Sequence, residues 1–207
     1  MVDGGHAEYL NADLNLRSLD ILVLAETKLI DSNRSDQIAK ILKHWTIIGR
    51  YDSEDGLKHM GLMLLSGGNS NIVSQIKNVT HQTAKRDKNL QVQGLIVRLM
   101  NGKNYGFVYC RSTPSNPEID AICKYFAECN ILMGDFNLSH QSPRDQDKIV
   151  KLCLEQKISM LNEITRTMSG NQLEYIIIDK DLEENCFVTS YNNFISDHKS
   201  INQIKWK

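Results

Sequence analysis

The apolar positions of the chain follow two periods, which predict helices and strands. Ala7, Leu10 and Leu14 recur at helical spacing within residues 7–18, which predicts an amphipathic helix. Residues 19–27 (LDILVLAET) instead form an almost continuous apolar run, the pattern of a strand that is covered on both faces. Both patterns recur along the rest of the chain.

In three further segments the apolar residues recur at helical spacing, which predicts helices. Most of the remaining apolar runs are short, as in strands. The first of these helices has its N-cap at Asp31 or Ser35, and the second opens with Pro117 near its first turn. Asn101-Gly102 separates two alternating runs, the strongest short signal for a β-hairpin. Helices are predicted within residues 31–45, 117–129 and 143–157, and strands within 46–51, 61–66, 89–110, 130–136, 173–179, 186–191 and 201–206.

Strands outnumber helices, and hairpins mix with strand–helix–strand units. This order predicts an α/β sandwich in which two mixed sheets lie face to face with helices outside. No internal repeat and no linker-like stretch divides the sequence, so a single domain is expected over residues 1–207.

Composition excludes several classes of protein. Hydrophobic residues make up 41% and charged residues 24% of the 207 residues, as in ordinary globular proteins. The formal net charge of -1 gives no general attraction to nucleic acid, although a local basic patch would suffice. The five cysteines include no Cys-x-x-Cys pair, so a disulfide framework and a structural zinc site are poorly supported. We expect a reducing compartment, nuclear or cytoplasmic, and no membrane segment.

Polar side chains stand at the ends of several predicted strands. Taken singly, each is most simply a solvated residue or part of a turn, because carboxylates are seldom buried. Together they form an oxygen-rich set with one histidine, which suits a hard cation such as Mg²⁺ or Mn²⁺ and acid–base work on a phosphoryl group. The sequence contains no P-loop, G-x-S-x-G or H-E-x-x-H motif, so other common hydrolytic mechanisms lack their characteristic residues. The set is Glu26, Tyr109, Asp135, Asn137, Glu174, Asp197 and His198.

Four stretches, LDILVLAETKL, ILMGDFN, LEYIII and ISDHKSI, occur in that order and resemble the endonuclease/exonuclease/phosphatase superfamily, which includes DNase I. The resemblance covers the chain from about Leu14 to the last predicted strand. The short YCRSTPSN loop and the helix after it look most like the endonuclease domains of retrotransposons and other mobile elements. The resemblance implies a four-layered DNase I-like sandwich, a Mg²⁺ or Mn²⁺ cofactor and a nucleic-acid substrate, most simply DNA. It also implies fusion to a reverse transcriptase or helicase in a longer protein.

The resemblance assigns roles to the strand-end residues. Glu26 matches the family's metal-binding glutamate, and Asp197 matches a carboxylate near the metal. Asp135 matches the aspartate that orients or deprotonates the attacking water, and Asn137 matches an amide that holds phosphate or water. Their i, i+2 spacing puts both on one side of an extended chain. A polar Asx-type turn after the strand is the plainer alternative.

Three further residues match phosphate contacts of the family. His198 matches the histidine that stabilises charge on the scissile phosphate, and Tyr109 matches a tyrosine whose hydroxyl points at that phosphate. Glu174 stands where the family has an aspartate that orients the histidine. Its extra methylene group displaces the carboxylate, and small displacements lower catalytic rates.

Substrate contacts are assigned more loosely. Thr165, or Thr167 if the register shifts, occupies the place of a threonine that touches the DNA backbone in retroelement endonucleases. Ser196 and Lys199 flank the Asp-His pair, and Arg111 follows Tyr109. These residues, together with Arg144 and the basic loop 81–89, could contact phosphates, but solvated surface charge is an equally simple interpretation.

The sequence departs from the family at its beginning. The family's first strand carries an asparagine of the metal site, but here a predicted helix precedes LDILVL, and Asn11 and Asn15 lie on that helix. Either the strand lies upstream of Met1 or the protein lacks it. The leading hypothesis is a metal-dependent, DNA-nicking endonuclease of a mobile element. The alternatives are a catalytically degenerate binding module and a phosphatase or lipid phosphodiesterase with the same site.

Overall fold

The computed structural model describes most of the chain. The described residues are 4–12, 19–25, 27, 32–51, 61–68, 72–82, 90–155, 158–160, 174–191 and 201–206. The helices are α1 (Gly4–Ala12), α3 (Ser32–Ile41), α4 (Asn116–Tyr125), α5 (Pro143–Glu155) and the 3₁₀ helix η2 (Lys180–Asn185). The strands are β1 (Ile21–Ala25), β2 (Thr46–Tyr51), β3 (Leu62–Ser66), β4 (Val73–Gln82), β5 (Leu90–Leu99), β6 (Asn104–Cys110), β7 (Ile131–Asp135), β8 (Ile158–Met160), β9 (Glu174–Asp179), β10 (Cys186–Tyr191) and β11 (Ile201–Trp206).

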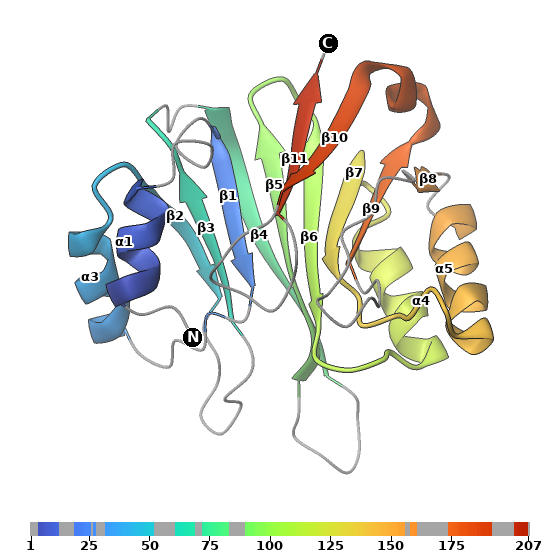
Figure 1. The fold of residues 1–207 in the computed structure, drawn as a ribbon. Helices are drawn as coiled ribbons and strands as arrows, with labels where there is room; N and C mark the ends of the chain where they lie inside the picture. The colour runs from blue at the N-terminus through green and yellow to red at the C-terminus, as the bar shows by residue number, and fades with distance from the viewer. Residues whose placement is uncertain are drawn as a thin grey trace.

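The strands form one large and two small sheets. The large sheet has the order β4-β5-β6-β7-β9-β8, in which β6 and β7 are parallel and every other pair is antiparallel. A small sheet has the order β1-β3-β2, and β10 pairs with β11 as a separate hairpin. Figure 1 shows β1, β2 and β3 beside the large sheet, with α1 and α3 on one flank and α4 and α5 on the other.

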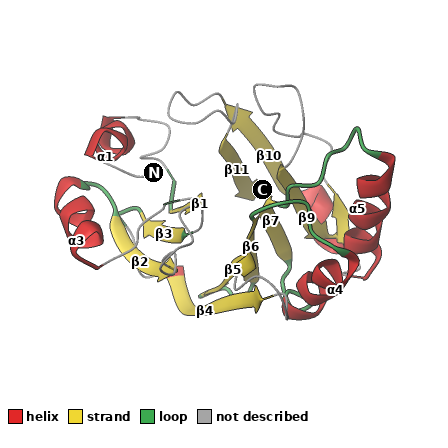
Figure 2. Ribbon diagram, turned by 90° about the horizontal axis from the view of Figure 1, so that it is seen from below, coloured by secondary structure: helices red, strands yellow, loops and turns green. Residues whose placement is uncertain are grey.

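Three apolar clusters lie between successive layers of this arrangement. One joins α1 and α3 to the β1-β3-β2 sheet, a second lies between the two sheets, and a third joins the large sheet to α4 and α5. Figure 2, seen from below, shows the helices outside and the strands between them. The expected four-layered, DNase I-like α/β sandwich is therefore confirmed.

The predicted hairpin at Asn101-Gly102 is confirmed as the connection between β5 and β6. Gly102 has φ +82°, a backbone conformation that glycine adopts without a steric penalty. The helix that was expected to start after Asp31 or Ser35 begins at Ser32, so the Ser35 alternative is wrong, while Asp31 lies outside the described residues.

The first helix starts earlier than predicted and is tied to the second. The α1 helix begins at Gly4 rather than near Ala7. Asn11 of α1 donates from Nδ2 to the carbonyl oxygen of Ile41 at 2.7 Å and accepts from the Lys43 amide at 2.8 Å. Because both ends of its side-chain amide are held at the end of α3, Asn11 serves packing here, which agrees with its predicted position on a helix.

Among the described residues, Cys110, Cys123, Cys129 and Cys153 form no disulfide, and the first three are buried. Cys110, Cys123 and Cys129 belong to the cluster beneath α4 and α5, so they act as small core residues. Within the described part of the chain, no helix is long and apolar enough to cross a bilayer.

Candidate active site

Four polar side chains form a row across the end of the large sheet. The strand register aligns Gln93 with Tyr109, Tyr109 with Asp135, and Asp135 with Glu174. Residues two positions away on the same strands, including Leu95, Phe107 and Ile176, belong to the cluster between the sheets. Side chains two residues apart share one face of a strand, so the whole row faces the small sheet.

Gly134 sets the backbone path of β7 just before Asp135. It pairs with Val108 on the parallel strand β6 and has φ +148°, outside the range that other residues adopt readily. A Cβ built on Gly134 would overlap the carbonyl oxygen of Val108. This close approach brings the end of β7 tightly against the end of β6.

The chain turns immediately after Asp135. The backbone amide of Asn137 donates to Oδ1 of Asp135 at 2.9 Å, which is an Asx turn, and Asn137 itself has φ +49°. Nδ2 of Asn137 donates to the carbonyl oxygen of Cys110 at the end of β6. The polar turn that the sequence offered as the plainer alternative is therefore present. It fixes the Asp135 carboxylate at the edge of the row, with one of its oxygens already accepting a hydrogen bond.

Tyr109 and Glu174 flank Asp135 on the two neighbouring strands. Tyr109 is 2% exposed and packs in the cluster between the sheets. Glu174 is half-buried, as is Asp135. The structure thus brings together three of the residues that were predicted for one site, while the orientation of the Tyr109 hydroxyl toward a phosphate stays a prediction.

The opposite face of the sheet supports this row. Tyr175, next to Glu174, donates its hydroxyl hydrogen to the carbonyl oxygen of Leu138 at 2.8 Å. Its ring meets the Phe136 ring edge to face, with centroids 6.1 Å apart. Burial raises the pKa of Tyr175, and the nearby carboxylates of Asp145 and Glu174 raise it further, so the phenol stays protonated. The turn after β7 is therefore anchored to β9.

Cys110 lies directly behind the row, in surroundings that favour the protonated thiol. It is completely buried, and burial raises the pKa of its thiol well above the usual range. The carboxylates of Asp135 and Glu118 add to this shift. A thiol that stays protonated lacks the thiolate form that reacts.

The end of β1 reaches the same edge of the molecule. The amide of Thr27 donates to the carbonyl oxygen of Gly61 at 3.2 Å, one residue beyond the β1–β3 ladder. The amide of Gly61 in turn donates to Oε1 of Gln93 at 2.7 Å. Through Gly61, the segment that follows β1 is joined to the first member of the row.

Sequence reasoning missed Thr27 and Gln93. Both are fully buried, and within the described part of the chain Thr27 Oγ1 and Gln93 Nε2 have no hydrogen-bond partner. A signal for Gln93 existed, because the alternation that puts Leu95 and Val97 on the inner face of β5 puts Gln93 there as well. A buried side-chain amide with an unsatisfied nitrogen is unusual in a folded protein and requires a physical explanation.

Several predicted residues lie outside the described part of the chain. Arg111 is described and lies half-buried in the bend after β6, and Arg144 is exposed in the first turn of α5. The residues that are not described are Glu26, Thr165, Thr167, Ser196, Asp197, His198, Lys199 and residues 83–89 of the basic loop predicted at 81–89. The first two residues of that predicted loop, His81 and Gln82, belong to strand β4 instead. Their roles remain predictions.

The described residues fit part of a metal site. Asp135 and Glu174 supply carboxylate oxygens from directly opposed positions, which suits a hard cation such as Mg²⁺. Among the described residues, no three of the side chains that commonly ligate metals form a cluster. A complete set would need Glu26 or Asp197 from the remaining segments.

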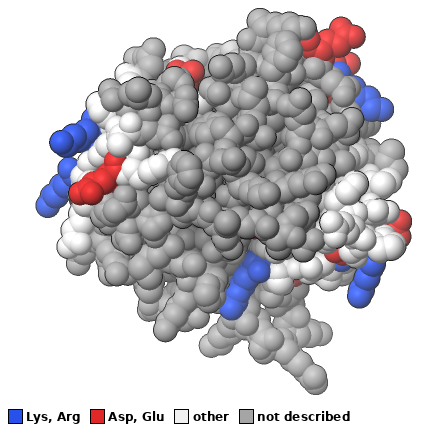
Figure 3. Space-filling model, in the orientation of Figure 1, with Lys and Arg blue, Asp and Glu red and all other residues white. Residues whose placement is uncertain are grey.

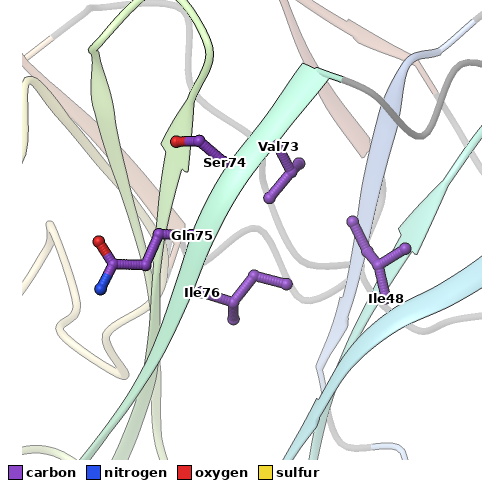
Figure 4. A pocket seen from close by; sticks show the side chains of 5 residues that line it. All are labelled: Ile48, Val73, Ser74, Gln75 and Ile76. Carbon is purple, nitrogen blue, oxygen red and sulfur yellow. The ribbon is translucent and has the colours of Figure 1, made fainter.

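Neither surface charge nor the hollow beside β4 marks a second site. Figure 3 shows basic and acidic side chains scattered singly over the described part of one face. A hollow of about 260 Å³ lies between β2 and β4 (Figure 4), where Ile48 faces Val73 and Ile76. Ile76 pairs with Val97, whereas the row lies farther along β5 at Gln93, so this hollow is at the other end of the sheet. The described residues that line it carry no charge.

Comparison with solved structures identifies the fold. An AP endonuclease from Leishmania major (LMAP) aligns with a TM-score of 0.73 and 11% identity, over 98% of this chain and 83% of that one. The chain has the fold of the endonuclease/exonuclease/phosphatase proteins. A mannosyl-6-phosphatase from Bacteroides thetaiotaomicron aligns with a TM-score of 0.60 and 11% identity, over 98% and 91% of the two chains. The human nocturnin catalytic domain, with a bound sulfate anion, aligns with 0.58 and 14% identity, over 98% and 87%.

Comparison of the sequence adds nothing to this. No protein-family model matches the chain, and no curated protein matches it either. At these identities the solved structures show a shared fold only. Any statement about the chemistry of the site therefore rests on the arrangement of its residues.

Proposed function

We propose that this protein is a divalent-metal-dependent phosphodiesterase that hydrolyses nucleic-acid backbone, in the form of a DNA-nicking endonuclease of a mobile element. The observation that carries the proposal is the opposed pair of carboxylates, Asp135 and Glu174, beside Tyr109 at one end of the inter-sheet face. The pair belongs to a fold that the chain shares with an AP endonuclease.

In this proposal the chain's own residues orient water and phosphate. Asp135 orients the attacking water and accepts its proton, because the Asx turn holds its carboxylate at the edge of the row. Tyr109 and His198 donate hydrogen bonds to the non-bridging oxygens of the phosphate, and Glu174 orients His198. Asn137 holds the turn after β7 against β6 through the Cys110 carbonyl.

A bound Mg²⁺ or Mn²⁺ would neutralise charge that develops on the phosphate oxygens. Glu26 and Asp197 are the proposed ligands, with the Asp135–Glu174 pair next to them. Thr165, Ser196, Arg111 and Lys199 are proposed contacts to the nucleic-acid backbone. A longer protein with a reverse transcriptase or helicase is the proposed context, and the nucleus or cytoplasm is the proposed compartment.

One feature favours a second candidate, a member that binds nucleic acid without cleaving it. Glutamate stands at position 174 where the family has aspartate, and its longer side chain shifts the carboxylate. A phosphatase or lipid phosphodiesterase remains the third candidate, since a mannosyl-6-phosphatase shares the fold.

The decisive experiment incubates the protein with supercoiled plasmid and Mg²⁺. We expect conversion to open circles, its loss with EDTA, and its loss in Asp135→Ala. Nicking that persists in Asp135→Ala would contradict the proposal. Binding of plasmid without nicking would support the binding module, and release of phosphate from phosphoinositides in preference to DNA cleavage would support the third candidate.

A further inference from the structure

Two buried polar side chains outside the proposed catalytic set have unsatisfied atoms. Among the described residues, Thr27 Oγ1 and Gln93 Nε2 have no hydrogen-bond partner, and both residues are 0% exposed. An unpaired buried donor or hydroxyl destabilises a fold, since it has lost water and gained nothing. Valine and methionine would fill the same volumes without this cost, so stability does not explain the polar residues.

The orientation of the Gln93 amide is fixed by its neighbour. Gly61 donates its backbone N–H to Gln93 at 2.7 Å, and only the oxygen of a carboxamide can accept that bond. The nitrogen of Gln93 is therefore the atom without a partner. The amide group is held in place by one end, and its free end is a hydrogen-bond donor.

Gly61 also binds Thr27, so one residue connects the two unsatisfied side chains. Its carbonyl oxygen accepts from the Thr27 amide at 3.2 Å, while its amide donates to Gln93. Thr27 belongs to the segment after β1 of the small sheet, and Gln93 belongs to β5 of the large sheet. These two hydrogen bonds, together called the relay, connect the two sheets at the end of the large sheet where the row lies.

The relay connects the large sheet to the residue that follows the proposed ligand Glu26 in the sequence. Gln93 is aligned with Tyr109 and, through it, with Asp135, about 10 Å away across two strand spacings. Thr27 directly follows Glu26 in the sequence. The relay is therefore well placed to set the separation between a ligand on the β1 side and the carboxylates of the large sheet.

We propose that Gln93 and Thr27 are positioning residues for metal binding, a role that rests on the proposed function of Glu26 as a metal ligand. Gln93 holds the segment after β1 through Gly61. Gln93 Nε2 donates a hydrogen bond to an oxygen atom of the side chains that hold the cation. The Thr27 hydroxyl forms its missing hydrogen bond with the same group of side chains. Residues that orient ligands in this way change metal affinity without touching the metal.

The test measures Mn²⁺ binding to the full chain by calorimetry, with no nucleic acid present. Thr27→Val keeps the shape of the side chain and removes the hydroxyl, and Gln93→Met removes the acceptor for Gly61. We expect each to weaken Mn²⁺ binding about tenfold, and Thr27→Ser to retain most of the affinity. In EDTA, Thr27→Val should melt at the same temperature as the parent or higher, because an unpaired buried hydroxyl is gone.

Asn11→Ala is the matched control. It removes an amide side chain that also joins two elements through backbone hydrogen bonds, but at the far side of the small sheet. It should lower the melting temperature and leave Mn²⁺ affinity unchanged. A loss of affinity in Asn11→Ala equal to that in Gln93→Met would mean that general destabilisation explains the effect, and would overturn the proposal.

The remaining outcomes separate the two proposals. Parental affinity in both Thr27→Val and Gln93→Met overturns the positioning role, even if the parent nicks DNA. A parent that binds Mn²⁺ but leaves plasmid intact contradicts the proposed nuclease, while weaker binding in the two variants still supports the positioning role. A parent that binds no Mn²⁺ overturns both.

Discussion

Asp135 and Glu174 are directly opposed on the antiparallel strands β7 and β9. The Cβ atoms of such a pair lie about 4.5–5.5 Å apart, and like charges in these positions repel each other. Both carboxylates are half-buried, which reduces the screening by water. A cation bound beside the pair would remove this repulsion.

We expect Glu174→Gln to stabilise the metal-free protein by about 0.5 kcal/mol, because one of two repelling charges is removed. The same substitution should reduce the rise in melting temperature that Mg²⁺ produces in the parent. Thermal unfolding in EDTA and in Mg²⁺ measures both effects. Glu8→Gln, at an exposed glutamate of α1, is the control and should change neither. A larger Mg²⁺ effect in Glu174→Gln than in the parent would contradict metal binding at this pair.

Gly134→Ala should destabilise the protein by about 3 kcal/mol or more, because the new Cβ overlaps the Val108 carbonyl and the backbone has φ +148°. Gly102→Ala is the matched control, since it also has a positive φ but open space around it. It should cost about 1 kcal/mol. Urea unfolding gives both values, and equal losses at the two glycines would show that close approach to β6 is unimportant.

Asn137→Asp should lower stability by about 1–3 kcal/mol, because it replaces the donor to the Cys110 carbonyl with a second acceptor. Asn137→Gly tests the backbone separately, since glycine accepts φ +49° without strain. It should be the milder change. If Asn137→Gly proves the more damaging of the two, the hydrogen bond to Cys110 is not the main contribution of this side chain.

Tyr175 should make the fold sensitive to alkaline pH. Its pKa is raised above 10.0 in the folded state by burial, with smaller contributions from Asp145 and Glu174. The folded state therefore holds the phenolic proton more tightly than the unfolded state. This stabilisation is complete below pH 10 and is lost as pH rises further.

Tyr175→Phe tests this linkage. It should cost about 1 kcal/mol near neutral pH, through loss of the hydrogen bond to Leu138, and the difference from the parent should shrink above pH 10. Urea midpoints at pH 8 and pH 11 measure it. Tyr125→Phe, at an exposed tyrosine, is the control for removal of a phenolic hydroxyl. A gap between parent and Tyr175→Phe that widens at pH 11 would refute the assignment.

Helices and strands were predicted from the sequence wherever the apolar residues of a segment followed one clear period. The β5–β6 hairpin was found because Asn101-Gly102 separates two alternating runs, and α5 was found because its apolar face repeats at helical spacing. The β4 strand was missed, since as an edge strand it carries polar side chains such as Lys77 and Asn78 in its middle. The three-residue strand β8 is too short to show any period.

The candidate site was predictable only in part, because register is not visible in one sequence. The resemblance suggested that Tyr109, Asp135 and Glu174 belong together, and the strand pairing places them in one row. It could not show that Gln93 completes the row or that Gly61 connects Gln93 to Thr27. Those relationships depend on contacts between segments that belong to different sheets and lie far apart in the sequence.

The packing of α4 has one consequence for the far face of the same hairpin. The ring of Phe126, just after α4, lies against Gly94 of β5 and Gly106 of β6, and a Cβ at either glycine would overlap the ring or the side chain of Leu132. These two outer positions therefore admit no side chain larger than that of glycine, while the inner face of the same two strands ends at Gln93 and Tyr109. Because a packed core transmits a displacement, enlargement of either glycine should push the hairpin away from α4 and disturb the alignment of Gln93 with Tyr109. The row is thus braced from behind by a single aromatic ring.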